Sequence, residues 1–508
     1  MLFKQTISTL PYNQWLTNDT ENKRLLRFCA IVMIISFAWI KYVYPYPNFM
    51  PPDSFSYIKA AADNEFINMW PIGYSKFLRL ISVFTHSDIT LVTLQYFLLI
   101  ASVLYFLFTV RYLLSPGKWL FRIVFTISIA NPLLPHIANF VSSDCLFASL
   151  SLTWFTQLLW ILYKQKLLII HAVIITLALM TRFSALYYPL VSLLIIFIIP
   201  MSTKTRRLGM FAIIILLLGF ISRTQYEYKV KTGTAQFSAF GGWQLAANAL
   251  YGYAYSQRDE EKDVPYEFRL LHSLVNDHMD SIRHAKNRPD SEPGIYYLWD
   301  FKSPLVIYLH RKIPPNSKIP YFYDWSTVAP LYGKYGRWLT MQHPVAYLKH
   351  YAWPNLLRYY SPPPYFMGVY NMGNNSVDPI TTTWFQWKNN RLSNRYNDAQ
   401  IHIMNVFPVL LAIINPAYIV CILFFFAFGG IRHCNNTAKR IIACVLLVWL
   451  SNTLFSVISA PIELRYQIFP IVTTLPFFVL FLAWLIQSLI IESKPYKKHG
   501  SAIPKPTV

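Results

Sequence analysis

Two carboxylates and two arginines interrupt apolar stretches of this sequence, and they are the residues best suited to do chemistry. Asp53 lies in the loop after the first long apolar run, and Asp144 directly precedes a later one. Arg182 and Arg465 each lie in a short turn between two apolar runs. A carboxylate can take a proton as a general base, whereas a guanidinium can pair bidentately with a phosphate and stays charged when partly desolvated.

Each of these residues also has a purely structural explanation. Asp53 and Asp144 both stand where a helix is expected to begin, so either can serve as an N-cap, although Ser142 would cap the second helix equally well. Arg182 and Arg465 can be anchors whose side chains reach lipid headgroups. The sequence leaves both explanations open.

Membrane-spanning helices are the elements that must position these side chains. Of the 508 residues, 55% are hydrophobic, 17% are aromatic and only 13% are charged, which is too apolar for an ordinary soluble protein. Ten apolar runs approach the length needed to cross a bilayer core of about 30 Å. They are 25–44, 89–114, 119–134, 145–163, 167–180, 186–201, 208–221, 406–428, 441–458 and 466–491. We therefore predict an all-α polytopic membrane protein with about ten transmembrane helices.

Basic residues predict the orientation of these helices. The chain has a formal net charge of +22, and outside the long polar segment most lysines and arginines fall in the tails and in short loops at alternate ends of the runs. This placement follows the positive-inside rule, so we assign that side, with both termini, to the cytoplasm and disfavour nucleic acid as a partner. Asp53, Asp144, Arg182 and Arg465 then all lie on the external side.

The same topology divides the chain into five parts. One long polar segment after the seventh span is the only part suited to form an external domain, with α-rich or mixed loop structure. Within it, 344–360 has helical spacing of apolar and aromatic residues and is predicted to lie on the membrane surface. The predicted parts are a cytoplasmic tail (1–24), an N-terminal transmembrane catalytic module (25–222) with its first external loop (45–88), the external, periplasmic domain (223–400), a C-terminal transmembrane module (401–491) and a basic cytoplasmic tail (492–508).

Acidic residues avoid the middle of every predicted span. Fourteen of the 23 Asp and Glu residues fall in 223–400, and six others fall in external loops. A proton-coupled transporter usually places a carboxylate near the bilayer midplane. The distribution instead favours chemistry at the outer membrane interface.

Four motifs in order along the chain carry a resemblance to a known family. Pro52-Asp53-Ser54, with Tyr57 and Ala61 and then Trp70-Pro71-Ile72-Gly73-Tyr74, resembles the first external loop of the GT-C superfamily of polyprenyl-phosphate-sugar-dependent glycosyltransferases. This superfamily includes the protein O-mannosyltransferases and the lipid A aminoarabinose transferases. The other three similar motifs are Ala130-Asn131-Pro132 through Ser143-Asp144-Cys145-Leu146-Phe147, Thr181-Arg182-Phe183 leading to Pro189, and Glu463-Leu464-Arg465-Tyr466 with Pro470.

The resemblance implies transfer of a sugar from a polyprenyl phosphate to an acceptor hydroxyl at the outer face of the membrane, with inversion. It implies that Asp53 is the general base and that Arg465 and Arg182 bind the donor phosphate. Asp144 is expected to orient the acceptor, to hold an arginine or to bind a metal. The chain departs from the family pattern at Ser54, where several branches carry a second acid, and no Asp-x-Asp occurs near Asp144.

The remaining expectations concern contacts and cofactors. Tyr57, Trp70 and Tyr74 are expected to contact the sugar or the lipid, or else to belong to the aromatic belt of the membrane. No cofactor is expected to be required; if a divalent metal takes part, Asp53 and Asp144 are its expected ligands. The acceptor can be a protein, a lipid or a glycan, and a bacterial inner membrane is the favoured location.

Two other functions remain as alternatives. An O-antigen ligase or polymerase also carries a large external loop and works through basic residues, which Arg337, His343, His350 and Arg358 would supply. Such ligases lack the acidic first loop found here. A non-enzymatic flippase or transporter of lipid-linked sugars is the second alternative, and the lack of mid-span charges disfavours it.

Overall fold

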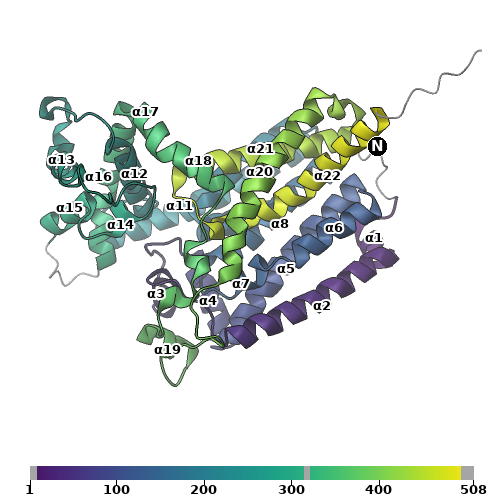
Figure 1. The fold of residues 1–508 in the computed structure, drawn as a ribbon, viewed down its shortest axis with the longest axis horizontal. Helices are drawn as coiled ribbons and strands as arrows, with labels where there is room; N and C mark the ends of the chain where they lie inside the picture. The colour runs from purple at the N-terminus through teal and green to yellow at the C-terminus, as the bar shows by residue number, and fades with distance from the viewer. Residues whose placement is uncertain (1–8, 314–320, 493–508) are drawn as a thin grey trace, which may run out of the picture.

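The computed structural model describes residues 9–313 and 321–492. Within these residues the chain is helical, with three isolated β-bridges and no strand. Figure 1 shows a bundle of long helices with a separate group of shorter helices beyond one end. The basic tail predicted over 492–508 lies outside the described residues except for its first residue, as do the first eight residues of the predicted N-terminal tail.

Eight helical segments of the described chain are long and apolar enough to cross a membrane. Two further apolar helices are shorter, Leu168–Thr181 and Phe183–Ile198. The prediction of an all-α polytopic membrane protein is confirmed at this level. The helices of the bundle are α2 (Thr20–Val43), α5 (Asp88–Leu114), α6 (Lys118–Ile129), α7 (Leu133–Ala138), α8 (Ser143–Lys164), α9 (Leu168–Thr181), α10 (Tyr188–Ile198), α11 (Thr203–Thr232), α20 (Val406–Ala427), α21 (Asn436–Ser459) and α22 (Ile468–Glu492).

Polar side chains fix where several of these helices begin. The carboxylate of Asp19 accepts hydrogen bonds from two backbone amides at the start of α2, and Ser87, Ser202 and Asn435 cap α5, α11 and α21 in the same way. Each cap satisfies amides that have no partner within their helix. Among the spans, α8 is the most buried, with 72% of its apolar window inside the protein, so it forms the centre of the bundle.

Polar contacts made by the two ends of α2 mark the two ends of the bundle. At one end Arg122 Nε lies 2.5 Å from a carboxylate oxygen of Glu21. At the other end Lys41 Nζ donates to Asn139 Oδ1 at 3.1 Å. The end of α22 and the beginning of α2 lie at the first of these ends (Figure 1). The first loop (45–88), with α3 (Asp53–Ala62) and α4 (Gly73–Ser82), lies at the other.

A second hydrophobic core lies outside the bundle, in what we call the helical module (residues 233–351). The helix that contains Gly336 packs closely on the helix that contains Leu245. A Cβ added to Gly336 would lie 2.4 Å from the backbone carbonyl carbon of Leu245. Ile67 of the first loop belongs to this core. The helices of the module are α12 (Ala239–Tyr253), α13 (Arg269–Ile282), α14 (Tyr296–Trp299), α15 (Pro304–Lys312), α16 (Tyr321–Gln342) and α17 (Pro344–Tyr347), and a π-helical turn (Leu348–Ala352) continues α17 into α18 (Trp353–Tyr360).

Residues 361–401, which include α19 (Pro379–Phe385), pack on the bundle rather than on the module. Asn371 N donates to Asn48 Oδ1 at 2.6 Å, and His86 Nδ1 lies 2.7 Å from the carbonyl oxygen of Trp384. The polar segment predicted as one external domain therefore contributes to two separate cores. Its second part packs against the first loop.

Candidate functional site

The beginnings of α3 and α8 are joined side by side, which places Asp53 next to Asp144. Asn48 and Phe140 form a parallel β-bridge, and Ser54 Oγ donates to the carbonyl oxygen of Val141 at 2.7 Å. One helical turn further along α3, Tyr57 Oη lies 3.1 Å from Ser143 Oγ. Residues 86 to 92 positions apart in sequence are thus held together by backbone and side-chain hydrogen bonds.

Neither aspartate caps its helix. Asp53 is the first residue of α3, and that helix has no side-chain cap. The cap of α8 is Ser142, whose hydroxyl accepts from Asp144 N at 3.4 Å and donates to Asp144 Oδ2 at 3.0 Å. Both carboxylates are therefore available for other partners, and the capping explanation does not account for either residue.

Arginines from two later turns of the chain meet these carboxylates. Arg182 follows the C-terminus of α9, and its Nη1 forms an ion pair with Asp144 Oδ1. Arg465 Nη1 lies 3.6 Å from Asp144 Oδ2 and 3.7 Å from Asp53 Oδ2. Its Nε also donates to Glu463 Oε2 at 2.7 Å. We call these five residues, Asp53, Asp144, Arg182, Glu463 and Arg465, the charged cluster.

The charged cluster is shielded from water. The side chain of Asp144 is 1% exposed and that of Arg465 is 9% exposed, whereas Asp53 is the most open carboxylate at 22%. Because Asp53 is the most exposed of the three carboxylates, it is the one that a ligand can approach most readily. Removing charges from water is unfavourable unless they are paired, and the cluster holds three carboxylates and only two guanidiniums.

Aromatic rings pack against the guanidinium faces. The ring of Tyr466 lies 4.4 Å from the Cζ of Arg182 and 4.7 Å from the Cζ of Arg465. Phe366 lies 4.7 Å from the Cζ of Arg465, on a segment anchored by a 2.9 Å hydrogen bond from Leu464 N to the carbonyl of Pro363. Because the rings cover the faces, the N–H groups at the edges of each guanidinium remain directed toward oxygen ligands.

Burial shifts the acid–base behaviour of two carboxylates in the cluster. Burial raises the pKa of Asp53 to about 6, and the positive charge of Arg465 opposes this shift. Burial likewise raises the pKa of Glu463, again opposed by Arg465. A carboxylate with a pKa near 6 is ionised at neutral pH yet is a stronger base than an ordinary aspartate, which suits a general base.

The three predicted aromatic contacts differ in their surroundings. Tyr57 is buried beside Asp53 and packs edge-on against Tyr74, with ring centroids 5.1 Å apart. Tyr74 is fully buried, and its hydroxyl donates to Gln95 Oε1 at 2.8 Å, so it supports Tyr57 rather than offering a surface to a ligand. Trp70 is partly exposed and contacts the module at Phe240 and Trp299.

Within the described residues, no group of three or more His, Cys, Asp and Glu side chains is arranged to hold a metal ion. The cation that lies between Asp53 and Asp144 is the guanidinium of Arg465. A metal bridging the two aspartates would have to displace this guanidinium.

Each of the basic residues considered for a ligase has a partner of its own. His343 Nε2 lies 3.0 Å from the carboxylate of Asp259, and His350 stacks on Tyr255. Arg358 pairs with Glu292, while Arg337 donates to the backbone of its own helix.

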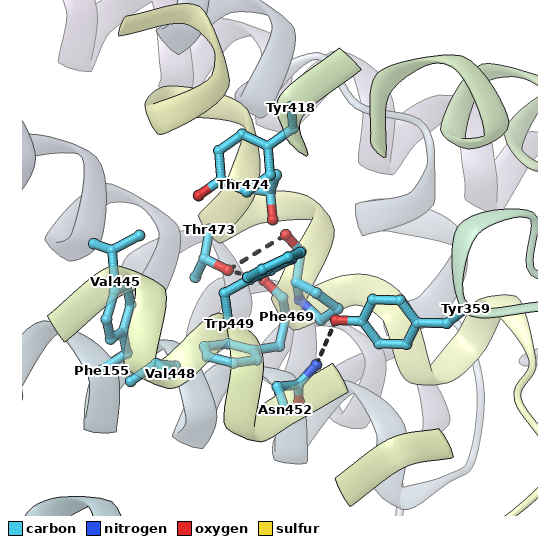
Figure 2. Close-up of a pocket in the computed structure, with 11 residues that line it drawn as sticks. Phe155, Tyr359, Tyr418, Val445, Val448, Trp449, Asn452, Phe469, Thr473 and Thr474 are labelled. Atoms are coloured by element: carbon cyan, nitrogen blue, oxygen red, sulfur yellow. Dashed lines mark hydrogen bonds between the residues drawn. The ribbon is translucent and has the colours of Figure 1, made fainter. Parts of the chain in front are cut away.

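A small pocket lies deeper in the bundle, between α8, α18, α21, α20 and α22 (Figure 2). Tyr359 and Asn452 form a 2.9 Å hydrogen bond at its edge. The pocket is mostly aromatic and aliphatic, and its residues Phe469 and Pro470 follow Arg465 along the chain by about one turn. None of its lining residues belongs to the charged cluster.

Sequence reasoning missed two contributions to the site. From the sequence, Glu463 is one of the acids in the predicted external loops and a member of one motif, with no role of its own, although an acid two residues before an arginine signals a local ion pair. Phe366 packs on Arg465, and the carbonyl of Pro363 accepts a hydrogen bond from Leu464 N. Both lie in a proline-rich stretch whose sequence does not indicate these contacts.

No protein-family model matches the chain, and no curated protein or solved structure is significantly similar to it.

Proposed function

We propose that this protein is a membrane glycosyltransferase that moves a sugar from a polyprenyl-phosphate donor to an acceptor hydroxyl at the outer face of the membrane. The observation that carries the proposal is the contact of a single guanidinium, that of Arg465, with both Asp53 and Asp144. Transfer from a lipid phosphate needs a base for the acceptor and a cation for the leaving phosphate. The charged cluster contains both, in contact, at one end of the bundle.

Asp53 is the proposed general base. The acceptor oxygen attacks the anomeric carbon, a new C–O bond forms, and the hydroxyl proton passes to Asp53. Its greater exposure supports this role over that of Asp144, which is enclosed, and its pKa of about 6 suits a general base. Attack from the side opposite the phosphate inverts the anomeric centre.

Arg465 and Arg182 are the proposed ligands of the leaving group. As the bond from the anomeric carbon to the phosphate oxygen breaks, the polyprenyl phosphate takes the electron pair and gains negative charge. Guanidinium groups fixed in a site of low water content stabilise that charge more than mobile water does. Asp144 is a positioning residue in this scheme, because it pairs with both arginines.

The proposed mechanism needs no metal, because the Arg465 guanidinium supplies positive charge at the position between the two aspartates. The external placement rests on the positive-inside rule, with both termini in the cytoplasm and a bacterial inner membrane as the expected location. The acceptor is a hydroxyl of a protein, a lipid or a glycan.

The test uses full-length protein reconstituted with a mixed pool of radiolabelled polyprenyl-phosphate sugars and a membrane extract as the source of acceptors. We expect wild type to release polyprenyl phosphate and to move label to acceptor, with or without a chelator. The Asp53→Asn variant should lose about 10²- to 10⁴-fold in rate. Asp63→Asn, an exposed aspartate at the other end of α3, is the matched control and should retain full activity.

Two outcomes would contradict the proposal. Full activity in folded Asp53→Asn protein would remove Asp53 as the base. Donor that binds but stays chemically intact in wild type, with label crossing the membrane, would favour a flippase.

A further inference from the structure

Helices α17 and α18, with the end of α16, carry a stripe of large apolar side chains that no other part of the described chain covers. Its members are each more than half exposed, and we call them the apolar stripe: Met341, Val345, Leu348, Trp353 and Leu357. An exposed apolar patch of this kind usually marks an interaction surface.

A π-helical turn keeps the apolar stripe on one side of the helix. The steps between its members are four, three, five and four residues. In a regular α-helix a step of five residues would rotate Trp353 about 140° away from Leu348. The wider turn over Leu348–Ala352 accommodates the extra residue, because its hydrogen bonds span five residues.

The opposite side of the same helix is anchored at the end of a membrane span. Asn355 Nδ2 donates to the carbonyl oxygens of Val457 at 2.7 Å and Ala460 at 2.8 Å, where α21 ends. Tyr347 Oη donates to the carbonyl oxygen of Ile458 at 3.2 Å. These bonds hold α17 and α18 at the level where α21 ends. In Figure 1, α17 and α18 run across the direction of the bundle helices rather than along it.

The surface next to this anchor is one that lipid must cover. Leu450, Leu454 and Ile458 form an exposed apolar row at steps of four residues along α21, up to its end. Ile458 is also the residue whose carbonyl binds Tyr347 of α17. The helix that carries the apolar stripe is therefore anchored at the end of an exposed apolar row of a span.

We propose that α17 and α18 form an interfacial helix whose apolar stripe enters the boundary between headgroups and acyl chains of the bilayer, at the end of the bundle that holds the charged cluster. The exposed Lys349 lies beside the stripe, where a lysine can reach a lipid phosphate. The occupant of the stripe is thus phospholipid. The interfacial helix fixes the height of the helical module above the membrane, and this inference stands whether or not the protein transfers a sugar.

The experiment measures membrane depth by spin labelling of full-length protein in vesicles of phosphatidylethanolamine and phosphatidylglycerol. Labels are placed by Val345→Cys, Leu348→Cys and Leu357→Cys, and wild type gives the background because its five cysteines are buried. Leu454→Cys is the lipid-facing control, and Asp277→Cys, exposed on α13, is the aqueous control. The readout is the ratio of collisions with oxygen to collisions with a water-soluble nickel chelate.

We expect the three stripe labels to show a ratio several-fold above that of Asp277→Cys and nearer that of Leu454→Cys. Ratios equal to the aqueous control would overturn the proposal, and so would labels shielded from both reagents, because shielding indicates a protein partner. Wild-type protein gives a second test that needs no variant. A phospholipid with a photoreactive group near its glycerol should cross-link to residues 341–357 and not to α13, and the reverse pattern would contradict the interfacial position.

Discussion

Arg465 Nη1 lies 3.7 Å from Asp53 Oδ2, so a residue that precedes the last helix contacts a residue that follows the first span. The contact places the proposed proton acceptor beside the proposed phosphate ligand. It also makes the first loop and the last hairpin depend on one another, because each supplies half of the interaction.

Replacing Arg465 tests whether the charged cluster is functional or only structural. Arg465→Gln should destabilise the protein by about 3–5 kcal/mol, because it leaves buried carboxylates unpaired. The double variant Glu463→Gln/Arg465→Gln removes one of those carboxylates and should regain part of the lost stability while staying inactive and weak in donor binding. Thermal unfolding in detergent and lipid-phosphate release measure the two effects. Recovery of activity in the double variant would assign Arg465 a structural role alone.

The pH dependence of transfer should report the ionisation of Asp53. Burial raises the pKa of Asp53 to about 6, and only its ionised form can take the acceptor's proton. We therefore expect kcat/KM to fall up to tenfold for each pH unit below about 6 and to level off above it. The residual activity of Asp53→Asn should lack this acidic limb. An unchanged limb in that variant would mean that another group titrates.

Gly73 tests the packing that holds the first loop against the end of α9. A Cβ at this position would lie 2.7 Å from the carbonyl carbon and oxygen of Met180, two residues before Arg182. Gly73→Ala should therefore destabilise the protein by about 1–3 kcal/mol and lower the rate of transfer. Gly117→Ala is the matched control, because its Cβ would meet nothing within 4 Å. Equal behaviour of the two variants in thermal unfolding would show that α4 adjusts without strain.

Trp70 tests the coupling between the first loop and the helical module. Its ring centroid lies 4.9 Å from that of Phe240 and 6.0 Å from that of Trp299. Trp299 in turn stacks on the buried Trp325. Trp70→Ala should increase hydrogen exchange at the start of α12 and raise the KM for acceptor more than it lowers kcat. Trp119→Ala, at an exposed tryptophan on α6, serves as the control. Unchanged exchange at α12 would show that other contacts hold the module in place.

The membrane helices could be predicted from the sequence because their cause is local. Leaving uninterrupted apolar runs such as 89–114 in water is unfavourable, and within lipid the backbone satisfies its hydrogen bonds only as a helix. The same local logic identified Asp53, Asp144, Arg182 and Arg465, since charged residues at the ends of spans stand out in an apolar chain. It could not decide whether the aspartates are caps, because a cap and an ion-pair partner have the same sequence pattern.

The tertiary structure decided which of these residues meet. The packing of residues 361–401 on the bundle also could not be predicted from the sequence. Phe366 packs on Arg465 and Asn371 N donates to Asn48, although the sequence pattern indicates that the stretch belongs to an external domain. Hydropathy reports how favourably each segment enters lipid, which depends on that segment alone. The charged cluster depends on contacts between four distant segments, and such contacts are set by how the helices pack together.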